Sequence, residues 1–169
     1  MRMTGHDAAP PTREELRQLR ALRGRAPHVI AHGRGEGVLA VALRDALAVR
    51  RGGRWSLVGW QSIQHGSWAE DEGRLAWELV DGTRDAVVLT GAGPLPGAFM
   101  ERVQASILVQ ERVEVPGGGS VVLSGRRNPD GTGGVTWMAE PSARVAMDDP
   151  AVQEFIVGQG ERLASEYGL

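Results

Sequence analysis

Four of the five tryptophans in the chain, Trp55, Trp60, Trp68 and Trp77, fall within 23 residues, although the whole sequence has only one tyrosine and two phenylalanines. Apolar and polar residues around them alternate with the period of a β-strand. Indole rings on alternating strand positions normally fill a core and find partners for their N–H groups. We therefore predict an antiparallel sheet with an aromatic core that contains Trp68, Trp77 and Trp137.

The composition is that of one ordinary globular domain. A chain of 169 residues buries enough surface to fold without disulfides or metal. It contains no cysteine, which excludes thiol nucleophiles and zinc ribbons and fits a reducing compartment, so we expect a cytoplasmic protein. A net charge of −2 attracts no polyanion, so we expect no nucleic-acid partner, and no apolar run has the length of a membrane span.

The N-terminal third begins with a predicted flexible leader, residues 1–11, which is small, polar and ends in two prolines. An N-terminal helix and loop follow over residues 12–36. Thr12 and Glu15 have the spacing of a capping box, and leucines recur at helical intervals as far as Arg23. Glycines and turn residues between positions 24 and 37 predict the loop.

From residue 37 to 169 we expect one domain. Five short strands between residues 38 and 90, separated by glycine turns, predict a meander that curls into a single sheet or half-barrel. A helix is expected over residues 97–110, with Phe99, Val103 and Ile107 on one buried face. The pattern over residues 108–115 is ambiguous between helix and strand.

The C-terminal part predicts a hairpin and a terminal helix. Residues 121–124 and 135–139 are expected to pair as strands around a turn. Asp149 as N-cap and Pro150 at the first helical position predict the start of the last helix. Gly158 and Gly160 weaken that helix, so we expect close packing against the sheet at these two positions.

Two segments carry a resemblance to a known family. Trp60-Gln61-Ser62-Ile63, Trp68 and Asp71-Glu72-Gly73-Arg74-Leu75 form a W-x-x-I, W, D-x-G-x-L pattern, and residues 101–106 read E-R-V-Q-A-S. This pattern resembles small pleckstrin-homology-like proteins of high-GC, actinobacterial-type bacteria, over about residues 37–169. The resemblance implies an α+β fold with a curled seven-stranded antiparallel sheet, a C-terminal capping helix, an extra helix between strands 5 and 6, and a short N-terminal helix. It implies no activity. Lipid-binding members use basic residues at the first hairpin turn, which we place at residues 44–46, where a single arginine stands beside an aspartate.

Arginines supply the candidate binding residues. The predicted N-terminal helix has a basic stripe, which could bind an anionic membrane or an acidic partner or could simply face water. A second group lies at a glycine turn, where one tryptophan could stack on a ligand. The candidates are Arg13, Arg17, Arg20 and Arg23 on the helix, and Arg50, Arg51, Arg54 and Trp55 at the turn.

Catalytic and metal-binding patterns are weak. His28 and His32 are four residues apart, but glycines and a proline surround them and no third ligand follows. His65 precedes the acidic residues 70–72 and has no nucleophile elbow beside it. Residues 91–97 contain glycines, but prolines remove amides that a phosphate would need. We therefore predict no enzyme activity, no cofactor and no metal.

The preferred hypothesis is a non-catalytic cytoplasmic interaction module that binds an unknown protein or peptide through a sheet edge or an open barrel end. A small-ligand or enzymatic pocket in the concave sheet is one alternative. Peripheral membrane association through the arginine stripe is the other, which we favour least. A homodimer remains open.

Overall fold

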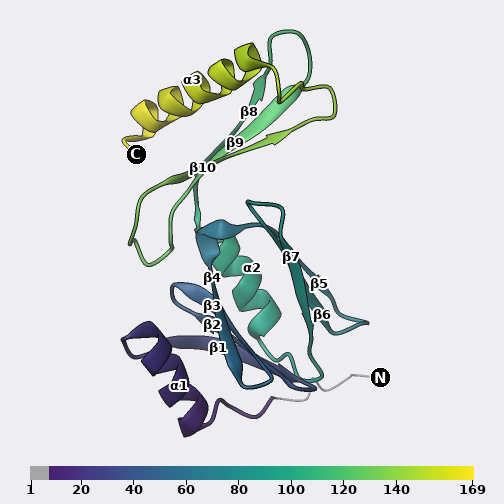
Figure 1. Cartoon of the computed structure of the whole chain (residues 1–169), viewed down its shortest axis with the longest axis vertical. Coiled ribbons are helices and arrows are strands. Elements are labelled where there is room, and N and C mark those ends of the chain that lie inside the picture. The colour runs from purple at the N-terminus through teal and green to yellow at the C-terminus, as the bar shows by residue number, and fades with distance from the viewer. Residues whose placement is uncertain (1–7) are drawn as a thin grey trace. The chain divides into compact units, whose positions relative to one another are not determined.

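The computed structural model describes residues 8–169 and is an α+β structure (Figure 1). Its described part has ten strands in three antiparallel sheets, three α-helices and one short 3₁₀ helix. The chain divides into two compact units, residues 1–104 and 105–169. The division falls inside the region 37–169 that the sequence predicts as one domain. Residues 1–7 of the predicted leader lie outside the described residues.

The first unit begins with α1 (Arg13–Arg23) and a four-stranded sheet in the order β1-β2-β3-β4. The strands are β1 (Val29–Gly35), β2 (Val38–Leu43), β3 (Ala46–Arg51) and β4 (Arg54–Gly59). The 3₁₀ helix η1 (Trp60–Ser62) leads into a three-stranded sheet of β5 (Ile63–Ala69), β6 (Arg74–Leu79) and β7 (Arg84–Val88). Helix α2 (Leu95–Ala105) follows, and its last residue begins the second unit.

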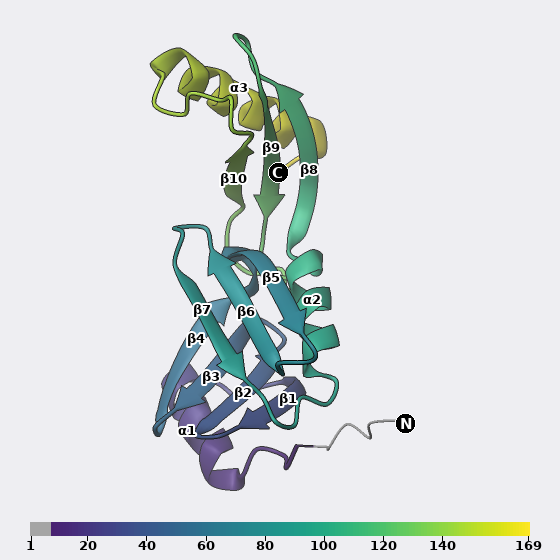
Figure 2. The same ribbon diagram turned by 90° about the vertical axis from the view of Figure 1, so that its right-hand side faces the viewer.

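One core fills the space between the two sheets of the first unit. Helix α2 closes the open side between the two sheets, next to β5 (Figures 1 and 2), and contributes Leu95, Phe99 and Val103 to the core. The ring of Phe99 meets that of Trp60 edge-on, with centroids 5.8 Å apart. The buried indole N–H of Trp60 donates to the carbonyl of Leu43 at 2.9 Å, so its polar group is satisfied.

Strand β2 is buried on both faces. Its small residues Ala40 and Ala42 point into the core between the sheets. Its larger residues Leu39, Val41 and Leu43 point the other way, where they pack with Leu19 of α1. This double burial explains why the segment from residue 38 to 43 contains only apolar residues. The N-terminal helix thus covers the outer face of the four-stranded sheet, and its predicted capping box is present.

The predicted loop over residues 24–37 is wrong, because half of it, Val29–Gly35, is strand β1. Its glycines allow close approaches between the two sheets. A Cβ on Gly35 would lie 2.0 Å from the carbonyl oxygen of Val88, and Arg34 exchanges backbone hydrogen bonds with Thr90 and Gly91. Strand β1 therefore joins the two sheets at one corner. The first hairpin turn accordingly lies near residues 36–37 rather than at residues 44–46.

Two further predictions differ from the structure. The stretch from residue 38 to 90 forms parts of two sheets rather than one, and all seven strands of the first unit precede α2. The helix expected over residues 97–110 runs instead from Leu95 to Ala105, and Ile107 belongs to a strand. Phe99 and Val103 are buried as predicted.

The second unit is a three-stranded sheet with one helix. The sheet has the order β10-β9-β8, with β8 (Ile107–Glu114), β9 (Ser120–Arg126) and β10 (Thr136–Pro141). Helix α3 (Pro150–Tyr167) starts as predicted, since the carboxylate of Asp149 accepts a hydrogen bond from the amide of Ala151. Valines of β8 and β9 pack against Val152 and Leu163 of α3.

The glycines of α3 are not sites of close packing. A Cβ on Gly158 or Gly160 would meet no heavy atom within 4 Å outside the helix backbone, so the packing expected there is absent. Trp137 is half-buried against the apolar cluster of the second unit, and Trp68 is half-buried against that of the first. Among the described residues, no helix has both the length and the apolar character that a membrane span needs.

Candidate functional site

The arginine stripe of α1 is only partly available. Arg13, Arg17 and Arg20 are exposed, and Arg17 forms an ion pair with Glu14 on the same helix. Arg23 is buried instead, with 6% of its side chain exposed, and it binds both carboxylate oxygens of Asp45 at 2.5 and 2.6 Å. The last arginine of α1 therefore holds the helix on its own unit and is not available to a partner.

A second ion pair fixes the start of α1. Two nitrogens of Arg34 on β1 donate to the two carboxylate oxygens of Glu15, at 2.6 and 3.1 Å. These hydrogen bonds lower the pKa of Glu15 to about 2, against the opposing effect of burial. Arg34 also binds the carbonyls of Ala9 and Pro10, so residues 9 and 10 of the predicted flexible leader are held beside β1.

The basic turn between β3 and β4 does not gather into one site. Arg50 donates to Gln18 of α1 at 3.3 Å, and Arg54 is exposed. Trp55 is half-buried and packs with the cluster under α1 rather than presenting a free ring. Arg51 reaches across to β7. The eight predicted binding residues therefore do not form one site. Some hold α1 on the four-stranded sheet, Arg51 connects the two sheets, and the others face solvent.

The histidines also lie apart. His32 is hydrogen-bonded through its ring to the carbonyl of Ala8 at 3.0 Å, and His28 lies outside any helix. His65 pairs in register with Glu78 on β6, not with the acidic residues 70–72. Within residues 8–169, no three histidine or acidic side chains come together as a metal site.

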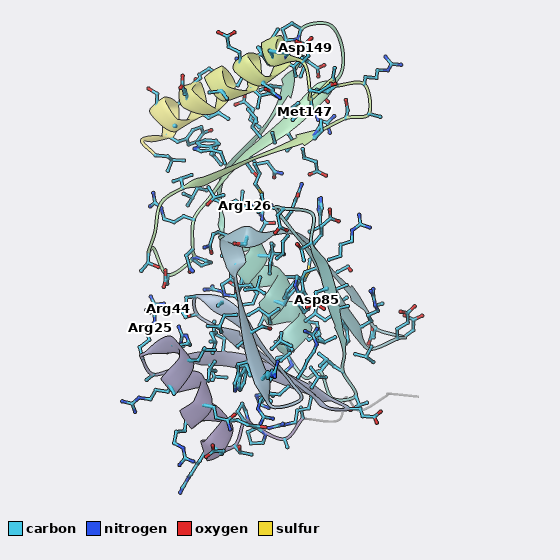
Figure 3. The ribbon with its side chains drawn as sticks, viewed as in Figure 1. Arg25, Arg44, Asp85, Arg126, Met147 and Asp149 are labelled. Carbon is cyan, nitrogen blue, oxygen red and sulfur yellow. The ribbon has the colours of Figure 1, made fainter. Side chains whose placement is uncertain are left out.

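The two outer strands of the three-stranded sheet, β5 and β7, differ in whether the backbone groups on their free edge are hydrogen-bonded. An edge strand exposes unpaired amides and carbonyls, to which another chain can add. On β7 the outward groups at the middle of the strand, those of Ala86, are occupied. Arg51 donates to the carbonyl of Ala86 at 2.8 Å, and Asp85, labelled in Figure 3, accepts from the amide of Ala86 at 2.7 Å. Arg51 also binds the carboxylate of Asp85 through two hydrogen bonds, at 2.9 and 3.1 Å.

On β5, the outward groups are open. The amide of Val80 donates to the carbonyl of Ser62. Counting back from Val80 in steps of two, Glu78 and Ala76 of β6 also direct their backbone groups toward β5. Ser67, the register partner of Ala76, is therefore bonded inward, and its neighbours Gly66 and Trp68 point outward. No backbone hydrogen bond of Gly66 or Trp68 outside the sheet is found in the described part of the chain.

Helix α2 forms a wall beside this open edge (Figure 2). The aromatic ring of Phe99 lies directly against Gly66, where an added Cβ would be 2.3 Å from ring carbon Cε1. Met100, the next residue of α2, has 43% of its surface exposed. An incoming strand beside β5 would therefore find backbone partners and an apolar helix surface together.

The outer face of the same sheet is hollowed. A depression of about 430 Å³ is floored by the small residues Ser67, Ala76 and Ala86. A polar row crosses the three strands at one end of it, and consists of His65, Glu78 and Arg84, with Arg84 donating to Glu78 at 2.9 Å. This face lies next to the β5 edge, so side chains of an added strand would extend it.

The sequence contains one signal for this edge that the predictions did not use. Gly66 stands in the middle of a strand pattern, and a strand glycine often marks a close approach by another part of the chain. Comparison of the chain with protein-family models, with curated proteins and with solved structures found no match.

Proposed function

We propose that the first unit is a pleckstrin-homology-like interaction module, without catalytic function, which binds a protein or peptide segment as an extra strand along β5. The architecture is supported by the element order. A four-stranded and a three-stranded sheet are followed by a helix that inserts Leu95, Phe99 and Val103 between them. In this account β1 is the first of the seven strands, α2 is the capping helix, and the second unit is an addition.

The observation that carries the proposed binding mode is the contrast between the two edges of the three-stranded sheet. Arg51 and Asp85 occupy the outward groups of β7 at Ala86. Gly66 and Trp68 leave those of β5 open beside α2. Backbone hydrogen bonds along such an edge supply affinity, and pockets beside it supply selectivity.

The other hypotheses fit the geometry less well. The space between the sheets is filled by Trp60, Trp77, Phe99 and their neighbours, which leaves little room for a ligand pocket there. The apolar side of α1 places Leu19 against the four-stranded sheet rather than toward a lipid surface. Because the chain contains no cysteine, we place the module in a reducing compartment, the cytoplasm.

Site-specific photo-crosslinking in the native host tests this function. Ser67 on β5 and Val88 on β7 are both exposed, lie on the outer face of one sheet, and flank its two opposite edges. A photoreactive residue at position 67 should give a discrete protein adduct, and the same residue at position 88 should not. A third probe at Leu57, on the edge strand β4, serves as the control for other edges. Adducts only from position 57 or 88, or none from any position, would contradict the proposal.

A further inference from the structure

The second unit has two strand edges of unequal character. The outer strand β8 carries Glu111, Arg112 and Glu114, and charges on an edge strand oppose pairing with another chain. The outer strand β10 begins Thr136-Trp137-Met138-Ala139 and has its first charge at Glu140. The less charged edge of this sheet is therefore β10, which carries no charge from Thr136 to Ala139.

Backbone hydrogen bonds define which groups of β10 are open. The amide of Ser142 donates to the carbonyl of Ser120 at 2.8 Å, so alternate residues, Glu140 and Met138, direct their backbone toward β9. Trp137 and Ala139 then point their amides and carbonyls outward. Neither residue has a further backbone hydrogen bond within the region that the structure describes. Pro141, which has no N–H, ends the edge.

The spacing of these open groups is self-complementary. We propose that the second unit pairs with a second copy of this chain through antiparallel β10 strands. A two-fold axis at Met138 would place Trp137 of each copy opposite Ala139 of the other, and the two pairs would form four backbone hydrogen bonds. A large side chain then faces a small one on both sides of the axis, so neither ring meets its equivalent.

An apolar groove adjoins β10 on the side of α3, while the ring of Trp137 lies over Gly125 of strand β9 in its own copy, where an added Cβ would be 3.1 Å from ring carbon Cη2. Trp137 and Ala139 are on the α3 face of the sheet, where they pack with the apolar cluster. A depression of about 370 Å³ between α3 and β10 is lined mainly by apolar side chains, and Gly160 contributes no side chain to it. Val157 on its rim has 60% of its surface exposed. An apolar surface formed by β10 and α3 therefore lies directly beside the open edge of β10.

This inference goes beyond the proposed function, because it concerns another sheet and another partner. The register can be tested with cysteines, since the natural chain has none. Pairing of Trp137 with Ala139 across the axis also brings Thr136 of one copy opposite Glu140 of the other. These two side chains are exposed. In a non-hydrogen-bonded antiparallel pair, the Cα atoms lie about 4.5 Å apart, which a disulfide can bridge.

The experiment compares two single variants of the full chain under mild oxidation. An equal mixture of Thr136→Cys and Glu140→Cys should give disulfide-linked dimers. Each variant alone should give almost none, because in a dimer of identical chains the two equivalent cysteines lie far apart. Equal crosslinking in all three samples, or none in the mixture, would overturn the proposed pairing.

Sedimentation velocity over a dilution series measures the affinity. The wild-type chain should dimerise, and Ala139→Pro, which removes an outward amide that β9 does not use, should weaken the dimer at least about tenfold. On β8, the amide of Val115 donates to the carbonyl of Gly119, so Arg112 and Gln110, at odd distances from Val115 along the unbroken register, direct their backbone outward. Gln110→Pro is therefore the matched control and should leave the dimer intact. A wild-type chain that stays monomeric throughout, or a Gln110→Pro effect equal to that of Ala139→Pro, would refute the inference.

Discussion

Gly66 and Phe99 are in contact so close that no other residue fits at position 66. A Cβ there would lie 2.3 Å from ring carbon Cε1 of Phe99 and 2.9 Å from Cζ. Since Phe99 is fully buried between the two sheets, its ring has little freedom to move away. This contact positions α2 beside β5, so it supports both the core and the proposed binding edge.

Gly66→Ala should therefore destabilise the first unit by about 1–3 kcal/mol, the usual cost of overpacking a core. Chemical denaturation followed by tryptophan fluorescence measures it. Gly97→Ala, in the same helix as Phe99 and with no atom within 4 Å of the new Cβ, is the control and should not destabilise. A smaller ring partner, Phe99→Leu, should relieve part of the cost of Gly66→Ala in a double-mutant cycle. Equal stability of Gly66→Ala and wild type would contradict the close contact.

Acid should weaken the docking of α1. The pKa of Glu15 is about 2 in the folded protein, below its ordinary value of 4.5, because Arg34 donates to its carboxylate. A lowered folded pKa contributes stability that is complete above 4.5 and disappears as the pH falls toward 2. Glu15→Gln should cost about 1–3 kcal/mol at neutral pH and flatten this part of the stability profile. Glu14→Gln, at an exposed position, should change neither. Denaturation curves across that pH range that are identical for Glu15→Gln and wild type would rule this role out.

Removing the cap on β7 should affect association more than stability. The ion pair between Arg51 and Asp85 is more than 40% exposed on both sides, so the double variant Arg51→Ala/Asp85→Ala should lose less than about 1 kcal/mol. It should nevertheless aggregate faster on mild heating, because Ala86 then offers an open edge. Arg84→Ala removes an exposed arginine whose side chain donates to Glu78 of β6 and not to the outward groups of Ala86, and this variant should aggregate like wild type. Light scattering at matched unfolded fractions distinguishes these outcomes.

Helix α3 should become more stable when a glycine is replaced. Nothing lies within 4 Å of a Cβ on Gly158, so Gly158→Ala should gain close to the full helix-propensity difference, about 0.5–1 kcal/mol. Thermal unfolding of the variant and of wild type measures the gain. A loss of stability would mean that this position packs against another surface.

The sequence predicted the elements whose pattern is local. The period-two run from Val38 to Leu43, the capping box of Thr12 and Glu15, and the N-cap at Asp149 all appear in the structure. Strand β1 was missed because Gly33 and Gly35 resemble a loop. In the structure Gly33 lets the side chains of Leu89 and Leu95 approach, and Gly35 lets strand β7 approach at Val88. The end of α2 was misplaced because Ile107 continues the four-residue spacing of Phe99 and Val103.

The candidate edge could not be predicted in the same way. Which backbone groups of β5 are open depends on its pairing with β6, and the cap on β7 depends on Arg51, which is 34 residues from Asp85 in the sequence. Such long-range contacts leave no periodic trace. Arginines that the sequence suggested as binding residues, Arg23 and Arg51, are instead used to join elements of the fold.

Amide hydrogen exchange of the free protein, resolved by residue, tests the central claim most directly. The amides of Gly66 and Trp68 should exchange rapidly, while that of Ser67 between them and that of Ala86 on the capped strand should be protected. Slow exchange at Gly66 and Trp68, equal to that of Ser67, would mean that β5 has no open edge, and the proposed binding mode would then fail.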